Sequence, residues 1–106
     1  MPKYLCKVSY SVEGAQGLLK EGGTARRAAV DQLCQSIGGK VESFYFAMGD
    51  DDAYLICDLP DETAAAALSI RVAGIGAARV RTVQLLTPAQ IDQAVKKSVT
   101  YRPPGK

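Results

Sequence analysis

The sequence predicts a single α+β domain, in which a four-stranded antiparallel sheet carries helices on one of its faces. Two observations lead to this prediction. Four segments alternate apolar and polar residues with the period of a β-strand, and segments with the three- and four-residue apolar spacing of a helix lie between them. The chain, 106 residues long and 47% hydrophobic, also has the length of one small domain.

The chain begins with a predicted strand followed by an interrupted helix. Residues 4–10 alternate as a half-buried strand does. Ser11 is a suitable cap for a short helix, which Gly22 and its glycine neighbour interrupt. Thr24 caps a clearer second helix, and the paired glycines at Gly38 end it.

The residue pattern in the middle of the chain predicts a β-hairpin followed by a further helix. Residues 41–48 and 53–59 are strands joined by a short Gly-Asp turn, a length that favours a β-hairpin. Asp61 caps the helix that follows, and its alanine-rich inner stripe implies a close approach to the sheet. Gly76 marks its end.

The last predicted elements are a strand over residues 80–86 and a short terminal helix. Thr87 is the cap of that helix, Pro88 takes its first position, and Gln90 completes a capping box. This is the strongest local signal in the chain. Ile91 is among the apolar residues that the helix carries.

The order of these elements is βαββαβ with a C-terminal helix. Right-handed crossovers with the helices on one side then give a four-stranded antiparallel sheet of ferredoxin-like type. We expect residues 1–98 to form one domain, and residues 99–106 to be an extended or mobile tail without periodicity.

Both faces of the predicted sheet carry large apolar or aromatic side chains, although the helices cover only one face. An uncovered apolar patch of this kind usually marks a contact surface. We therefore expect the protein to self-associate as a homodimer whose sheets pack face to face, an assembly of dimeric α+β barrel type. The candidate interface residues are Leu5, Tyr45, Tyr54 and Ile56.

Composition excludes several classes of function. The chain has no histidine, which excludes His-ligated zinc or haem and Ser-His-Asp catalysis. A net charge of +2 is far from the basic surface of a nucleic-acid binder. The three cysteines lack C-x-x-C spacing, and no segment resembles a signal peptide or membrane span. We expect a cytoplasmic protein with no cofactor, no metal site, and no nucleic-acid or membrane partner.

The densest group of carboxylates lies in the turn of the hairpin. Gly49 is followed by three aspartates, and the last, Asp52, enters the strand beside Tyr54. Asp52 is therefore the candidate catalytic carboxylate, and these three residues are candidates for ligand binding. A cation site and a solvated turn are the alternatives, because turns favour Asp for local hydrogen bonding alone.

A second candidate group lies at the start of the clearer helix. Arg27 and the free backbone amides there would hold a compact anion, with the amphipathic Tyr10 on the first strand nearby. A salt bridge from Arg27 to Glu21 or Asp31, or a solvated arginine, is the alternative that the residues favour. We expect any small ligand to be an anion or acid lodged near Arg27, Tyr10 and the aspartate turn.

The chain resembles the GYD domain family over residues 3 to about 95. The likeness is carried by YLCKVSYSVEG, by TARRAAVDQLCQSIGGKVESFYFAMGDDDAYLICDLPD and by RVRTVQLLTPAQID. The resemblance implies a small bacterial protein of ferredoxin-like, dimeric α+β type, in a family whose biochemical role is largely unassigned. Asp51 replaces the tyrosine of the motif that names the family, whereas Gly49 and Asp52 fit the pattern.

Three interpretations of function remain open at this point. The first is a small-molecule-binding or structural module with a cleft between sheet and helices. The second is a cofactor-independent enzyme, similar to an oxygenase or isomerase, that uses Asp, Tyr and Arg in that cleft. The third is an interaction protein recognised through its surface or basic tail. A deep pocket with converging polar groups would favour the enzyme, and a closed apolar pocket the binding module.

Overall fold

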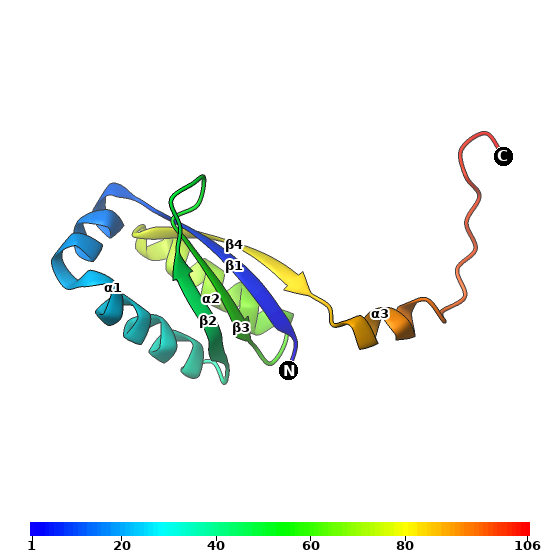
Figure 1. The fold of residues 1–106 in the computed structure, drawn as a ribbon, viewed down its shortest axis with the longest axis horizontal. Helices are drawn as coiled ribbons and strands as arrows, with labels where there is room; N and C mark the ends of the chain where they lie inside the picture. Colours follow the sequence, from blue (N-terminus) through cyan, green and yellow to red (C-terminus); the bar gives the residue numbers. More distant parts are fainter.

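The computed structural model describes all 106 residues and has the predicted order of elements (Figure 1). The elements are β1 (Lys3–Tyr10), α1 (Val12–Gln35), β2 (Lys40–Phe46), β3 (Ala53–Asp58), α2 (Glu62–Ile75), β4 (Ala78–Leu85) and α3 (Pro88–Ala94). The strand order is β2-β3-β1-β4, and every neighbouring pair is antiparallel. This is the expected α+β, ferredoxin-like arrangement.

The start of α1 and both ends of α2 follow the predicted capping residues, whereas α1 ends at Gln35 with Ser36 as its C-cap. The Ser11 hydroxyl accepts a hydrogen bond from the third backbone amide beyond it, and Asp61 does the same at the start of α2. Gly76 ends α2 in the left-handed conformation, with φ of 84°. The two predicted N-terminal helices follow one another as α1, which kinks at Gly22, where φ is 82°.

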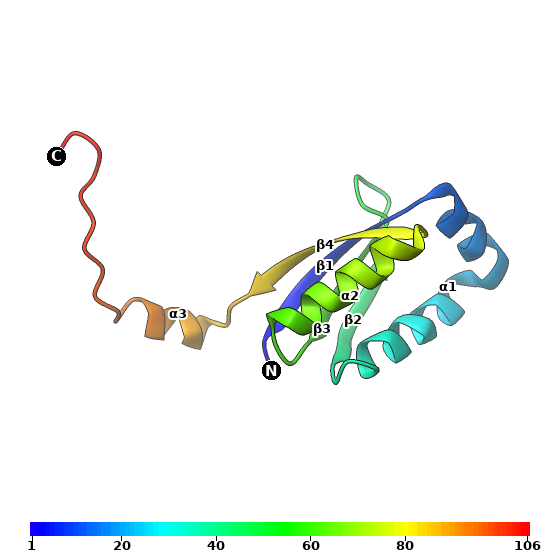
Figure 2. The same cartoon turned by 180° about the vertical axis from the view of Figure 1, so that it is seen from behind.

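Helices α1 and α2 cover the same face of the sheet and leave the other face uncovered (Figures 1 and 2). The core between helices and sheet is small, because only 12 of the 106 residues are buried. Its buried apolar members are Tyr4, Cys6, Val8, Cys34, Ala53, Leu55, Cys57, Leu59, Ala65 and Leu68.

All three cysteines are free and lie in this core. The sulfur atoms of Cys6 and Cys57 are 3.8 Å apart on neighbouring strands. Contacts with the sulfur atoms of Cys34 and Cys6, and then burial, raise the pKa of the Cys57 thiol. The cysteines are therefore small core residues, and the protonated thiol of Cys57 is not poised for nucleophilic chemistry.

After β4 the chain leaves the packed body (Figure 1). Every residue from Leu86 to Lys106 is exposed, including all of α3. The radius of gyration is 17.0 Å, whereas a compact chain of this length has about 13 Å. Helix α3 has the predicted capping box but does not pack on its own sheet. No helix is both long and apolar enough to cross a membrane.

Candidate functional site

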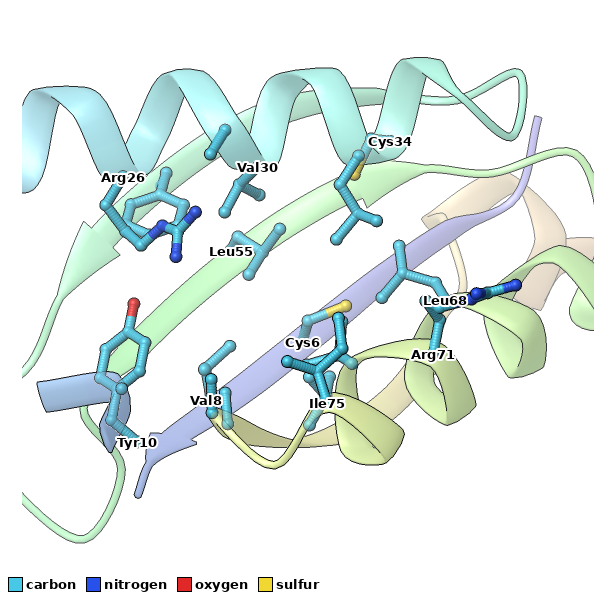
Figure 3. Close-up of a pocket in the computed structure, with 18 residues that line it drawn as sticks. Cys6, Val8, Tyr10, Arg26, Val30, Cys34, Leu55, Leu68, Arg71 and Ile75 are labelled. Atoms are coloured by element: carbon cyan, nitrogen blue, oxygen red, sulfur yellow. The ribbon is translucent and has the colours of Figure 1, made fainter. Parts of the chain in front are cut away.

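A cavity of about 300 Å³ lies between α1, α2 and the covered face of the sheet (Figure 3). It forms because α1 packs on the β2 side of the sheet and α2 on the β4 side, so the two helices do not close over the centre. Small residues such as Ala29 and Ala78 line part of the cavity and leave its volume unfilled. Its size is that of a small-molecule site.

The cavity wall is almost entirely apolar. Fifteen of its eighteen lining residues are hydrophobic. They come from both helices and from all four strands or their ends, so one ligand would contact every layer of the domain. An apolar cavity with few polar groups is the usual form of a ligand pocket. The apolar side chains labelled in Figure 3 are Val8, Val30, Leu55, Leu68 and Ile75.

Two polar side chains meet at one end of the cavity. Arg26 on α1 and Tyr10 on β1 point toward one another across it (Figure 3). The Nε atom of Arg26 is buried and makes no hydrogen bond, although it lies 3.3 Å from a carboxylate oxygen of Glu21. Burial raises the pKa of the Tyr10 hydroxyl, so it stays protonated at neutral pH. This end therefore offers a cation and a hydroxyl to a ligand.

Arg27, the arginine singled out from the sequence, does not line the cavity. Its Nε donates to Asp31 at 3.1 Å, one helical turn further along α1. This is one of the two salt bridges that the sequence left open. The neighbouring Arg26 lines the cavity instead. The sequence does indicate that Arg26, and not Arg27, faces the cavity. Arg26 lies three, four and seven residues before Ala29, Val30 and Leu33, a spacing that places these residues on one face of a helix.

The aspartate turn is not part of the cavity. Gly49, Asp52 and Tyr54 are absent from its lining, so the structure does not join them with Arg27 and Tyr10 in one site. Asp52 instead accepts a hydrogen bond from the backbone amide of Tyr10 at 2.8 Å, which fixes the turn to the end of β1. Of the sequence candidates for ligand binding, only Tyr10 lines the cavity.

Asp51 is the aspartate of the turn that the structure buries, with 3% of its surface exposed. Its carboxylate accepts hydrogen bonds from Arg81 at 2.6 Å, Ser9 at 3.2 Å and Tyr54 at 3.3 Å. Arg81 above all lowers the pKa of the Asp51 carboxyl group. Asp58, at the end of β3, pairs with Lys3 at 2.9 Å.

The uncovered face of the sheet carries the four candidate interface residues. Strand register places Leu5 opposite Ile56, and Tyr45 opposite Tyr54, all on the face that points away from the helices. Tyr45 is 72% exposed. The polar network around Asp51 lies on the same face, because it joins side chains of β1, β3 and β4 there.

No group of three or more Cys, Asp or Glu side chains is arranged to hold a metal ion. Tyr4 is the second buried polar side chain without a hydrogen-bond partner, but it does not line the cavity.

Comparison with known proteins gives one family match. The sequence model of the GYD domain matches residues 4–95, which extend from β1 into the end of α3. No curated protein and no solved structure matches the chain significantly.

The Asp51 network predicts a pH-dependent stability. A carboxyl group whose pKa is lowered on folding stabilises the native state above its ordinary pKa, and the contribution is lost as the pH falls through the lowered value. Asp51→Asn is thus expected to reduce the free energy of unfolding at neutral pH, and its difference from wild type is expected to shrink as the pH falls below about 4. Chemical denaturation at a series of pH values measures both.

The matched control is Asp50→Asn, because Asp50 is exposed and no hydrogen bond or ion pair holds its side chain. It is expected to leave the denaturation midpoint unchanged over the same pH range. A difference between Asp51→Asn and wild type that does not vary with pH would contradict the assignment.

Proposed function

The chain belongs to the GYD domain family, and we propose that this member is a homodimeric module that binds a small molecule with an apolar body and an anionic head. The cavity between α1, α2 and the sheet is the proposed site. The three buried, free thiols are typical of a protein of the reducing cytoplasm, which is the compartment that we propose.

The observation that carries the ligand proposal is the guanidinium group of Arg26 at the end of an apolar cavity, whose buried Nε–H makes no hydrogen bond and has only the ion pair with Glu21 at 3.3 Å. A buried donor without a hydrogen bond is costly, and an anionic oxygen of a ligand would supply the missing bond. Arginine and a carboxylate form a strong, charge-assisted pair, and the Tyr10 hydroxyl would donate a further hydrogen bond. The apolar remainder of the cavity would then hold the body of the ligand.

The alternative is a cofactor-independent enzyme, and the cavity offers it little. No carboxylate lines the cavity, so a general base is missing there. Asp52 is occupied with the Tyr10 amide, and Asp51 lies on the opposite face of the sheet with Arg81. A general base must reach the proton that it abstracts. The geometry therefore supports binding better than turnover.

The homodimer is supported by how much surface the chain leaves exposed. The monomer exposes 7571 Å², whereas a compact protein of 11.3 kDa exposes about 5,700 Å². The excess is more than the roughly 800 Å² per partner that a stable interface of standard size buries. The uncovered sheet face and the residues after β4 both contribute to this excess.

The side-chain pattern of the uncovered face favours one two-fold axis, parallel to the strands. Such an axis places β1 over β3 of the partner copy and β4 over its β2. On the two central strands an apolar residue then opposes an apolar residue, and a lysine lies over an aspartate or a tyrosine ring. The opposed pairs are Leu5 with Ile56, Lys3 with Asp58 and Lys7 with Tyr54.

Ligand binding is tested with decanoate and decanol, which share a tail and differ in the anionic head. Wild type is expected to bind decanoate more tightly. Arg26→Met is expected to weaken decanoate binding by about tenfold to a hundredfold, because a charge-assisted hydrogen bond is lost, and to leave decanol binding nearly unchanged. Isothermal titration calorimetry measures these affinities.

Arg27→Met is the matched control, because Arg27 is the adjacent residue of the same helix but pairs with Asp31 outside the cavity. It is expected to bind decanoate as wild type does. Equal losses in the two variants, or equal binding of decanoate and decanol by wild type, would defeat the proposed anion site.

Dimerisation through the uncovered face is tested with Tyr45→Asp. Tyr45 is exposed and makes no side-chain hydrogen bond in the monomer. A charge at this position is therefore expected to weaken the contact with a partner copy and to leave the fold of the monomer unchanged. Sedimentation velocity is expected to show a dimer for wild type at micromolar concentration and mainly monomer for Tyr45→Asp. Met48→Asp, in the exposed turn after β2, is the control and is expected to remain dimeric. A monomeric wild type would refute the dimer.

A further inference from the structure

The C-terminal arm, residues 86–106, has no partner within its own chain. It extends away from the body (Figures 1 and 2), and its hydrogen bonds all join residues of the arm to one another. It nevertheless carries a series of exposed apolar side chains. These are Leu86, Ile91, Val95, Val99 and Tyr101.

The sequence of this arm contains helix-capping residues that an unstructured tail would not need. Thr87 and Gln90 form a complete capping box, and proline is at the start of the helix. A helix of seven residues is nevertheless too short to persist alone in water. Ile91 and Val95 lie one turn apart and hence on one face, which needs an apolar surface to cover it.

We infer that the arm docks on a second copy of this chain, at the corner where β2 begins, β3 ends and α2 begins. The inference rests on the proposed face-to-face dimer. The arm starts where β4 ends, and strand register places that end beside Lys3 and, through it, beside Asp58 and Lys40. The root of the arm and the corner are thus at the same end of the sheet. With the two-fold axis parallel to the strands, β4 of one copy lies over the partner's β2, so the arm leaves the sheet next to that corner.

The opposite charges of the arm and of this corner also favour docking of the arm there. The arm has four Lys and Arg residues and one Asp, whereas residues 1–85 have nine Lys and Arg residues against ten Asp and Glu. The corner carries the exposed acidic residues Glu42, Asp61 and Glu62. Lys96 and Lys97 come directly after Val95, the C-cap of α3, so they would face this acidic corner while the apolar side of α3 packs on the partner copy. In a symmetric dimer both arms dock in this way.

The position of the arm is tested by carbodiimide cross-linking of a mixture of unlabelled and ¹⁵N-labelled full-length protein. Mass spectrometry then distinguishes links within a chain from links between chains. We expect mixed-label peptides that join Lys96 or Lys97 to Glu42, Asp61 or Glu62. Links of these lysines only within one chain, or to other surfaces of the partner, would overturn the inference.

The contribution of the arm is tested with the double variant Ile91→Asp, Val95→Asp. Sedimentation equilibrium is expected to show a dimer dissociation constant raised by about tenfold or more, because two apolar side chains lose their contact. Gln93→Asp adds a charge on the other side of α3 and is expected to change the constant little. A dimer that both variants leave equally stable would refute the docked arm but leave the face-to-face dimer standing. A wild-type monomer would refute both.

Discussion

Two helices can cover only one face of a four-stranded sheet, and in this domain both faces carry apolar side chains. The covered face holds a core that buries only 12 residues of the whole chain. The other face leaves Tyr45 and its aromatic and aliphatic neighbours in contact with water. A small domain of this kind gains much stability from a partner, because hydrophobic burial dominates folding. The proposed dimer and docked arm both follow from this constraint.

The covered face also explains the cavity. Because α1 and α2 pack near opposite edges of the sheet, the side chains that line the space between them, some of them as small as alanine, leave it unfilled. Close packing is the norm in protein interiors, so an unfilled apolar space is where a ligand would gain most from burial. Arg26 at one end supplies the polar group that would orient such a ligand. The two faces thus have separate proposed roles, ligand binding and association.

Much of the fold could be predicted because its signals are local. Strand alternation and the caps at Ser11, Asp61 and Thr87 depend on residues close in sequence. The site was harder to predict, since choosing Arg26 over Arg27 depends on the exact rotation of α1 after its kink. Three consecutive aspartates point in different directions, and only the folded turn shows that Asp51 is the buried one. The capping box predicts a helix but not which chain its apolar face contacts.

Native mass spectrometry of the gently purified full-length protein tests the central claim most directly, because it reports subunit number and retained ligand in one spectrum. The account predicts the mass of two chains, with additional mass from a bound small acid that Arg26→Met no longer retains. A monomer would contradict the role of the uncovered face. A dimer that takes up no small acid, even when decanoate is added, would contradict the role of the cavity.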